Sequence, residues 1–482
     1  MNLLINGRKT SPIKRQLTLL LYNFLLVIFL LVDLTKWVAA LVKQATFFLV
    51  RKPLKGNEKR DWFWGQKYGL VGKSLTLDKN TQNKRVMIHC ASVGEVVAAI
   101  PLIKKLLASN DVDNSSDTEL SFVVTTNTKT GKEQLFRLLD KALKVKVSHT
   151  YLPVDLPWLM SSLLKQVQPD LVIIMEVELW PNLINQCYKY KNKQGHKIQL
   201  PVCIVNARLT DKTRRGYQKL TSLSEPMIQQ LHQVYARNQT DFDNYLAMGI
   251  NPDKLSLLGN IKFDIEPADM SAAQELRDAL NLTKRKVIIV GSSHEGEESL
   301  LVEAYQQFKS QYPDLILIIC PRHPERFIPV FEYLTSQQLS VVKMSESESA
   351  ETTTDVLLGD QMGQLSKLYG VCDIAFVGGS FAERGGHNPI EAAAFAKPII
   401  MGPHVYNNPE ICNTLANGGG LVIANTHFEF ITQINLWLSD SELTSNTGKK
   451  ALATLQNNAG IINTLSTELL RTLNAKNSNA KE

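Results

Sequence analysis

The amino-acid sequence predicts an α/β protein with two domains, each built on a parallel sheet, preceded by an apolar amino-terminal segment. After residue 80, short apolar runs alternate with segments of helix length, as in parallel sheets covered by helices on both faces. The chain has 482 residues, of which 44% are hydrophobic and 21% charged. A chain of this length is long enough for two or three globular domains, and the composition excludes a disordered or collagen-like chain.

The expected strands fall into two sets, separated by an acidic, proline-containing stretch at 259–270. We therefore expect an amino-terminal domain at 61–258, a linker at 259–284 and a carboxy-terminal domain at 285–482. The expected strands are Arg85–Cys90, Phe122–Thr126, Leu171–Met175, Val202–Asn206 and Gln233–Ala236 in the first set, and Lys286–Val290, Leu315–Cys320, Ser340–Val342, Asp355–Leu357, Ile374–Val377, Pro398–Met401 and Leu421–Ile423 in the second.

The amino-terminal residues 1–60 predict a membrane anchor. The run from Gln16 to Val32 carries no charge, and as a helix it would be roughly 25 Å long, slightly less than a bilayer core. Basic residues flank the apolar region on both sides, and no convincing signal cleavage site follows it. We expect an uncleaved anchor that spans the membrane or lies deep in its interface, with the other domains on the cytoplasmic side. The alternative is a buried core helix.

Charge and cysteine usage limit the possible ligands. The net charge of +7 favours anionic ligands or an anionic membrane surface without choosing between them. The six cysteines show no C-x-x-C spacing, and four of them lie in apolar runs that are typical of buried strands. We therefore expect reduced thiols in the core and no zinc site.

Ligands of parallel α/β sheets bind beyond the carboxyl ends of the strands, so the loops there are the candidate sites. The loop Ala91–Glu95 has two interpretations. Ser92 and Glu95 fit a capping box at the start of a helix, and their spacing alone favours that structural role. Alternatively, Glu95 faces the cleft as a general base, in which case we expect the helix amino terminus to lower its pKa.

A second loop places two carboxylates, Glu176 and Glu178, directly after a buried strand. They would point to the same side if the chain stayed extended, and Pro181 suits the start of the next helix. Lys262 lies near the domain junction, where a lone lysine is by itself a weak signal.

Four loops in the second half predict a nucleotide site. Glycines, hydroxyls and backbone N–H groups after the strands would bind an anion, and Arg322 can pair with a phosphate. Pro389 suits a first helical position, and Glu391 can accept from ribose hydroxyls. There is no Walker lysine, which argues against ATP hydrolysis. The loops are Gly291–Glu298, Pro321–Arg326, Gly359–Gln364 and Gly378–Glu391.

Several of these segments together resemble one family, the Kdo transferases of lipopolysaccharide synthesis. Members of that family transfer 3-deoxy-D-manno-octulosonic acid (Kdo) from its CMP-sugar to a lipid A precursor. The similarity runs from the anchor to about residue 425. The matching motifs are Ala-Ser-Val-Gly-Glu at 91–95, Glu-Leu-Trp-Pro-Asn at 178–182, Asn-Ala-Arg-Leu at 206–209, Lys-Phe-Asp at 262–264, His-Glu-Gly-Glu-Glu at 294–298, Pro-Arg-His-Pro-Glu-Arg-Phe at 321–327, Phe-Val-Gly-Gly-Ser at 376–380 and Glu-Arg-Gly-Gly-His-Asn-Pro at 383–389.

The resemblance implies a GT-B fold, in which two Rossmann-like domains face a central cleft. It makes Glu95 the catalytic base, contrary to the preference from spacing, and gives Glu176 and Lys262 roles in supporting the transition state. This chain has Gln364 where the family usually has Glu, and Val177 where it often has Thr. The positions implied to contact CMP are Pro321, Arg322, Met362, Gly363, Gln364, Asn388, Pro389, Ile390 and Glu391.

The function implied is inverting transfer of Kdo from CMP-Kdo to a hydroxyl of the lipid A precursor lipid IVA, in lipopolysaccharide core biosynthesis. We expect no metal or other cofactor, an anionic membrane surface as partner and no nucleic acid. The expected location is the cytoplasmic side of the inner membrane of a Gram-negative bacterium. The alternatives are another GT-B transferase that uses a different nucleotide sugar, a metal-dependent transferase, and a membrane-anchored nucleotide-binding scaffold without catalysis.

Overall fold

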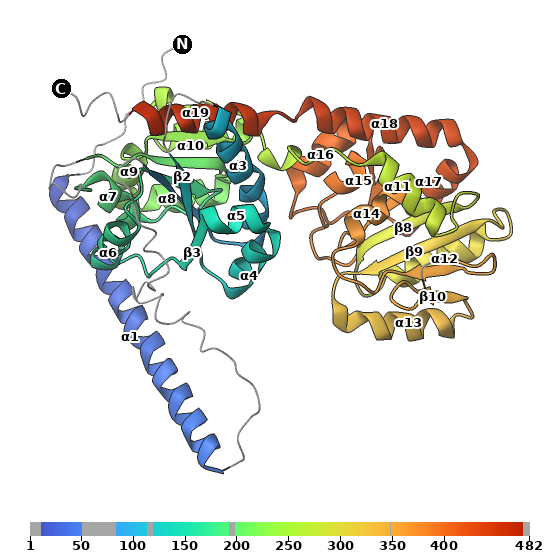
Figure 1. Ribbon diagram of the computed structural model, residues 1–482. Coiled ribbons are helices and arrows are strands. Elements are labelled where there is room, and N and C mark those ends of the chain that lie inside the picture. Colours follow the sequence, from blue (N-terminus) through green and yellow to red (C-terminus); the bar gives the residue numbers. More distant parts are fainter. Residues whose placement is uncertain (1–10, 51–82, 113–118, 192–197, 348, 476–482) are drawn as a thin grey trace. The chain divides into compact units, whose positions relative to one another are not determined.

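A computed structural model describes residues 11–50, 83–112, 119–191, 198–347 and 349–475. The chain divides into two compact units (Figure 1). Unit 1 comprises residues 1–261 and 460–482, and unit 2 comprises Lys262–Ala459. Each unit contains one seven-stranded sheet in which all paired strands are parallel. The predicted α/β fold class is therefore confirmed.

The sheet of unit 1 has the strand order β3-β2-β1-β4-β5-β6-β7. Its strands are β1 (Lys84–Cys90), β2 (Leu120–Thr126), β3 (Val147–Tyr151), β4 (Leu171–Met175), β5 (Val202–Ala207), β6 (Gln233–Ala236) and β7 (Leu255–Leu257). The helices of this unit are α1 (Pro12–Val50), α3 (Val93–Val112), α4 (Lys129–Leu138), α5 (Lys141–Lys146), α6 (Pro157–Val167), α7 (Pro181–Tyr188), α8 (Asp211–Lys219), α9 (Thr221–Gln229), α10 (Gln239–Ala247) and α19 (Ile461–Ala475).

The sheet of unit 2 has the strand order β10-β11-β9-β8-β12-β13-β14. Its strands are β8 (Lys286–Ser293), β9 (Leu315–Pro321), β10 (Val341–Lys343), β11 (Val356–Leu358), β12 (Ile374–Val377), β13 (Ile399–Met401) and β14 (Leu421–Ile423). The helices are α11 (Met270–Ala279), α12 (Glu297–Phe308), α13 (Phe327–Ser336), α14 (Leu365–Val371), α15 (Ile390–Ala394), α16 (Pro409–Asn417), α17 (His427–Ser439) and α18 (Ser441–Asn457).

The central strands are buried on both faces, which explains their continuous apolar runs. In β1, Val86 and Ile88 belong to one core cluster of unit 1, and Met87, which lies between them in sequence, belongs to the other. Unit 2 repeats this pattern with two clusters of its own. All six cysteines are free and buried, as the sequence predicts.

Two strands of unit 1 were missed in the sequence. The strand β3 carries Ser148 and His149 among its five residues and directly follows the lysine-containing helix α5. The strand β7 is only three residues long. Neither segment has the apolar run on which the other strand predictions rest, and each forms a strand because it pairs with a neighbour in the sheet.

The two units differ from the domain boundaries expected from the sequence. The helix α19 belongs to unit 1, where Ile462, Leu465 and Leu469 join the core cluster that includes α3. The segment expected as a linker contains α11, which packs against α14 of unit 2. The chain thus enters unit 2 at Lys262 and returns to unit 1 at Gly460.

The amino-terminal helix α1 is continuous through Asp33. Its segment Pro12–Asp33 has a mean hydropathy of 2.0, and among the described residues this is the one helix long and apolar enough to cross a membrane. Leu17 and Phe24 are each 61% exposed. The alternative of a buried core helix is therefore wrong.

Candidate active site

In each sheet there is one point at which successive strands stop being added on one side and begin to be added on the other. Ligands of α/β sheets bind at this point. In unit 1 this point lies between β1 and β4, because β2 and β3 extend the sheet on one side and β5 to β7 on the other. Glu95 follows β1 and Glu176 follows β4. The topology therefore brings these two predicted catalytic residues to the same edge of the sheet.

Glu95 lies in the first turn of α3 and is 5% exposed. One carboxylate oxygen accepts a hydrogen bond from the backbone N–H of Ala91 at 2.8 Å, and the other accepts from the Ser92 hydroxyl at 3.1 Å. The N–H of Glu95 in turn donates to the Ser92 hydroxyl oxygen at 3.3 Å. Glu95 is therefore held in the capping arrangement that its spacing indicates, and this arrangement fixes its position at the sheet edge.

The pKa of Glu95 is raised from 4.5 to about 7, with burial as the largest cause. The neighbouring carboxylates of Glu176 and Glu178 raise the pKa further, while the hydrogen bonds from Ala91 and Ser92 oppose the rise. The expectation that the helix amino terminus would lower this pKa is therefore wrong. Desolvation and two nearby negative charges outweigh the partial positive charge of the helix end.

Glu176 marks a sharp turn at the end of β4. Its φ of 55° lies in the left-handed region, so the chain does not stay extended through Glu176 and Glu178. Its backbone is held by β5 and the loop beyond, because its N–H donates to Val205 and its carbonyl accepts from Arg208. Glu176 is 8% exposed. A strained backbone with a buried carboxylate beside another carboxylate is typical of a functional site.

Glu178 lies within electrostatic reach of Glu95, although it is less buried than either Glu95 or Glu176. Burial raises the pKa of Glu178, opposed by hydrogen bonds from Asn127 and Trp180. Three carboxylates therefore share this edge of the sheet. Pro181 is the first residue of α7, as predicted.

A buried histidine, His89, was not among the site residues expected from the sequence, and it pairs with Trp180. The Trp180 indole N–H donates to His89 Nε2 at 3.3 Å, and His89 Nδ1 lies 2.9 Å from the Thr125 hydroxyl. Burial lowers the pKa of His89 to about 4, so the imidazole is neutral and can accept from the indole. His89 thus orients Trp180 beside Glu178. Because His89 lies inside an apolar strand, the sequence alone indicates only a core residue.

Lys262 is the first residue of unit 2 and follows Ile261 directly. The N–H of Ile261 donates to Asn206 Oδ1 at 3.2 Å. Asn206 is buried in β5 with a φ of 54°, and β5 pairs with the strand that ends before Glu176. The chain that leads into Lys262 is therefore anchored at the carboxyl edge of the unit 1 sheet.

In unit 2 the corresponding reversal lies between β8 and β12, and the loops after these strands are joined by Glu297. This side chain is fully buried. Its carboxylate accepts backbone N–H groups from His294 at 2.9 Å, Gly379 at 2.8 Å, Ser380 at 2.9 Å and Phe381 at 3.0 Å. These four N–H groups therefore donate to a protein carboxylate and do not serve a phosphate.

Gly378 allows the same two loops to approach each other. A Cβ atom at this position would lie 2.5 Å from the Ser292 carbonyl oxygen and 2.9 Å from the carboxylate of Glu297. Because one of these neighbours is backbone and the other is held by four hydrogen bonds, neither can move aside at low cost. Only glycine fits here.

Positive and titratable groups gather at this edge of unit 2. His294 Nε2 lies 2.9 Å from His387 Nε2 with the rings stacked, and the His323 ring centroid is 5.7 Å from that of His294. The pKa of His387 is lowered to about 4, first by burial and then by Arg322. Arg322 is exposed and also acts on Glu391. The side chains at this edge therefore bring cationic and neutral donors to one place, as an anionic ligand requires.

The other predicted CMP contacts lie on this carboxyl side of the sheet in different settings. Pro321 ends β9. Gly363 has a φ of 87°, and Gln364 precedes α14, whose Leu365 and Tyr369 pack close to Gly291 of β8. Met362 is 49% exposed.

The remaining predicted contacts surround α15. Asn388 Oδ1 accepts from the N–H of Ile390 at 3.2 Å. Pro389 precedes α15 and is not its first residue, and that helix has only five residues. We therefore assign no anion-binding role to its amino terminus.

Comparisons with known proteins agree with this arrangement. A family model described as 3-deoxy-D-manno-octulosonic-acid transferase (kdotransferase) matches residues 63–265, and a second, glycosyl transferases group 1, matches residues 273–454. The 3-deoxy-D-manno-octulosonic acid transferase of Haemophilus influenzae is 34% identical over 403 residues, covering 83% of this chain and 89% of that protein. The transferase of the same name from Bordetella pertussis is 32% identical over 329 residues, covering 67% and 72%.

A solved structure supports the fold class. The UDP-GlcNAc 2-epimerase of Neisseria meningitidis superposes with a TM-score of 0.51 at 15% identity, covering 81% of this chain and 99% of that chain. At this identity the similarity concerns the fold alone. The family model and the relatives carry the assignment further, because they span both units. The chain therefore belongs to the 3-deoxy-D-manno-octulosonic acid transferase family and is a glycosyltransferase of the GT-B class.

Proposed function

We propose that the protein transfers Kdo from CMP-Kdo to a hydroxyl of the lipid A precursor lipid IVA, in one step and with inversion at the anomeric carbon. The acceptor oxygen forms a bond to the anomeric carbon as its proton passes to the carboxylate of Glu95. The bond between that carbon and the phosphate oxygen breaks, and CMP leaves with the electron pair. Family membership supports the transfer of Kdo, whereas the acceptor, the stereochemistry and the residue roles are the proposal.

The observation that carries this mechanism is the raised pKa of Glu95, about 7, at the edge of the unit 1 sheet. An ordinary glutamate is a weak base, and the efficiency of general-base catalysis rises as the pKa of the base approaches the working pH. A carboxylate with a pKa near 7 is still substantially ionised in the cytoplasm and accepts a proton more readily. Its hydrogen bonds to Ala91 and Ser92 keep it in place.

Charge on the departing CMP and on the carboxylate of Kdo is held by cationic side chains. Arg322 has the planar fork that pairs with a phosphate, and it is exposed beside His387. Lys262 and Glu176 keep the supporting roles implied by the family motifs. Because fixed positive charge can stabilise a leaving phosphate without a metal ion, we propose a metal-independent transfer.

The experiment that tests this proposal is incubation of the full-length protein with CMP-Kdo and tetraacylated lipid IVA, followed by mass spectrometry of the lipid. We expect the mass of one or more Kdo residues to be added, and NMR of the product to show an inverted anomeric centre. Glu95→Gln should abolish transfer while CMP binding is retained. Full activity of Glu95→Gln, or retention of the donor configuration, would overturn the mechanism.

Two further experiments distinguish the proposed function from the alternative transferases. An excess of UDP-sugars should not compete with CMP-Kdo, whereas a transferase with another donor would be inhibited. EDTA should leave the rate unchanged, and a loss that is restored by a divalent cation would indicate a metal-dependent enzyme. The proposed site of action is the cytoplasmic surface of a Gram-negative inner membrane, where the acceptor lipid is embedded and where the apolar helix α1 would reside.

A further inference from the structure

We infer that α1 lies in the plane of the membrane interface with one apolar face in the lipid, and that its segment 12–33 does not cross the bilayer. The argument begins with hydrogen bonds near the middle of that segment. Tyr22 donates its hydroxyl hydrogen to Asp155 Oδ2 at 3.0 Å, and Asn182 Nδ2 donates to Asn23 Oδ1 at 2.7 Å. In a spanning helix, Tyr22 and Asn23 would lie near the bilayer midplane, where these partners in unit 1 could not reach them.

The receiving site for α1 is built into unit 1. Asp155 is 1% exposed, and its carboxylate also accepts the backbone N–H groups of Asn182 and Leu183 at the start of α7. The side-chain amide of Asn182 donates to the Asp155 carbonyl as well. The groups that bind Tyr22 and Asn23 thus belong to the interior of unit 1 and cannot follow α1 into a membrane.

The helix has two different faces. Its half-buried side chains recur every three or four residues and include several polar groups: they are Arg15, Thr18, Leu19, Tyr22, Asn23, Leu26, Val27, Leu30 and Asp33. The opposite face is apolar and between 42% and 71% exposed: Ile13, Leu17, Leu20, Leu21, Phe24, Leu25, Ile28, Phe29, Leu31 and Val32. A helix with one docked stripe and one uncovered apolar face is typical of an interfacial helix.

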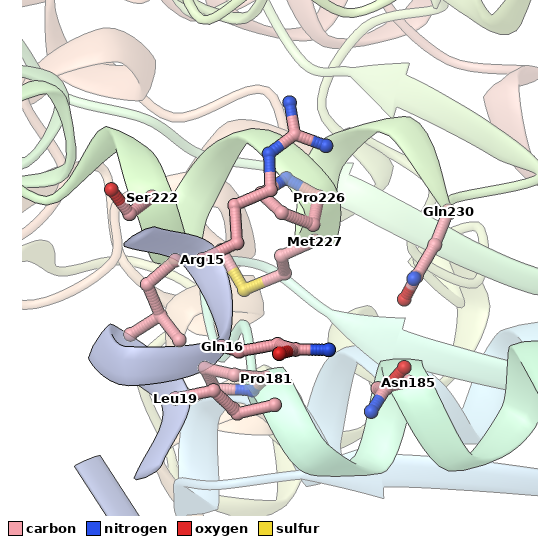
Figure 2. A pocket seen from close by; sticks show the side chains of 10 residues that line it. Arg15, Gln16, Leu19, Pro181, Asn185, Ser222, Pro226, Met227 and Gln230 are labelled. Carbon is pink, nitrogen blue, oxygen red and sulfur yellow. The ribbon is translucent and has the colours of Figure 1, made fainter. Parts of the chain in front are cut away.

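The seam between α1 and the rest of unit 1 includes polar groups beside its apolar ones. Figure 2 shows Arg15 and Gln16 of α1 near Asn185 of α7 and Gln230, around a pocket that Leu19, Pro181, Ser222, Leu223, Pro226 and Met227 also line. Arg15 forms a 2.9 Å ion pair with Glu225 of α9 at the same seam. Placing carboxamides and an ion pair in hydrocarbon is costly, so this part of α1 lies at the level of headgroups and water.

The path of the chain excludes a membrane crossing by segment 12–33 of α1, because the chain would then have to cross back. The docked part of α1 and the strand β1 both belong to unit 1, so the chain between them starts and ends on one side of the membrane. It must therefore cross an even number of times. The sequence 51–82 contains no run of more than five residues without Asp, Glu, Lys or Arg, whereas a spanning helix needs about 20 apolar residues. Because residues 51–82 offer no segment that could cross back, segment 12–33 of α1 does not cross the membrane.

The occupant of the uncovered face is an anionic lipid surface. The helix α8 carries Lys212, Arg214, Arg215 and Lys219 against one acid, Asp211, and none of its residues is buried. Tyr217 of α8 lies within electrostatic reach of Tyr22, so this basic helix is adjacent to the middle of α1. Basic side chains beside an inserted apolar face add an electrostatic attraction to anionic headgroups.

The first test is accessibility from each side of the membrane. Ser11→Cys and Lys144→Cys are made separately in the full-length chain, whose own cysteines are all buried. Both are treated with a membrane-impermeant maleimide in inside-out vesicles and in spheroplasts. We expect both residues to react from the same side. Labelling of Ser11→Cys only from the side opposite to Lys144→Cys would overturn the inference.

The second test measures depth and docking in vesicles of phosphatidylethanolamine and phosphatidylglycerol. A fluorophore on Phe24→Cys should be quenched more strongly by 5-doxyl than by 12-doxyl lipid, because the helix lies shallow. Stronger quenching by 12-doxyl lipid indicates a spanning helix, and no quenching by either indicates that another surface, such as a second copy, covers this face. Both results contradict the inference.

Disulfide formation tests the docked face directly. In membranes, Leu19→Cys should cross-link to Met227→Cys, since both residues line the same pocket. The matched pair with Leu20→Cys should not cross-link, because Leu20 is 64% exposed on the opposite face. An efficient cross-link from Leu20→Cys and none from Leu19→Cys would refute the docking. These results hold whichever donor is used, so they are distinguishable from a failure of the proposed reaction.

Discussion

Replacing Glu95 with glutamine removes a buried charge while keeping nearly the same shape, so it tests the perturbed carboxyl group apart from catalysis. The pKa of Glu95 is about 7 in the folded protein, against the ordinary value of 4.5. This difference of about 2.5 pKa units corresponds to roughly 3.4 kcal/mol. Because the folded state binds the proton more tightly than the unfolded state, Glu95 costs stability progressively as the pH rises from 4.5 to 7.

The sign and size of the effect follow by linkage. At pH 5.5 the folded carboxyl is still mostly protonated, and the stability cost is about 1.4 kcal/mol; at pH 8 it is about 3.3 kcal/mol. The glutamine of the variant does not titrate, so the stability of Glu95→Gln relative to the wild type should rise by about 2 kcal/mol between these two pH values. The absolute difference at either pH also depends on the hydrogen bonds to Ala91 and Ser92.

The assay is denaturant unfolding of the full-length wild type and Glu95→Gln at pH 5.5 and pH 8, followed by a probe in unit 1. NMR of ¹³C-carboxyl-labelled glutamate gives the titration of Glu95 directly, by subtraction of the variant spectrum. A stability difference that is independent of pH, or a Glu95 resonance that titrates near 4.5, would refute the reasoning. Either result would also remove the main support for Glu95 as an effective base.

Three further predictions concern neighbouring groups. Glu178→Gln removes a negative charge that raises the pKa of Glu95, so the acid limb of the kcat/KM profile should move to lower pH; an upward shift would contradict this. Glu297→Ala should destabilise unit 2 by about 3 kcal/mol or more in thermal unfolding, because four backbone N–H groups lose their acceptor; an unchanged Tm would contradict this. Gly378→Ala should destabilise the protein by about 2 kcal/mol or more. The control Gly216→Ala has open space around its Cβ position in α8, so it should be neutral or stabilising by up to about 1 kcal/mol. Equal effects of the two substitutions would refute the close-approach argument.

Much of the architecture was predictable from the sequence, because the buried strands of a parallel sheet must be apolar on both faces. The predicted strands Leu171–Met175 and Ile374–Val377 agree with β4 and β12 residue by residue. The strands β3 and β7 were not predictable in the same way, since they form by pairing with neighbours and not by their own apolar content. The position of α19 was equally hidden, because nothing local shows that its apolar face completes the core of unit 1.

The site shows the same division. The motifs in the sequence placed Glu95 and Glu176 after strand ends, but their state depends on contacts between segments far apart in the chain. The raised pKa of Glu95 requires burial together with carboxylates that follow another strand. The turn at Glu176 depends on β5 and the loop beyond it. Glu297 accepts hydrogen bonds from the loop N–H groups of Gly379 and Ser380, which lie more than 80 positions away in the sequence.

The sequence by itself determined the fold class, the apolar amino-terminal segment and the family, because apolar patterning and contiguous motifs are local properties. Tertiary structure alone decided the protonation state of Glu95, the role of Glu297 and the docking of α1. Each of these depends on which distant groups surround a side chain. For α1 the difference is physical: hydropathy measures what a helix can be surrounded by, whereas the bonds from Tyr22 and Asn23 establish what one face of it already contacts.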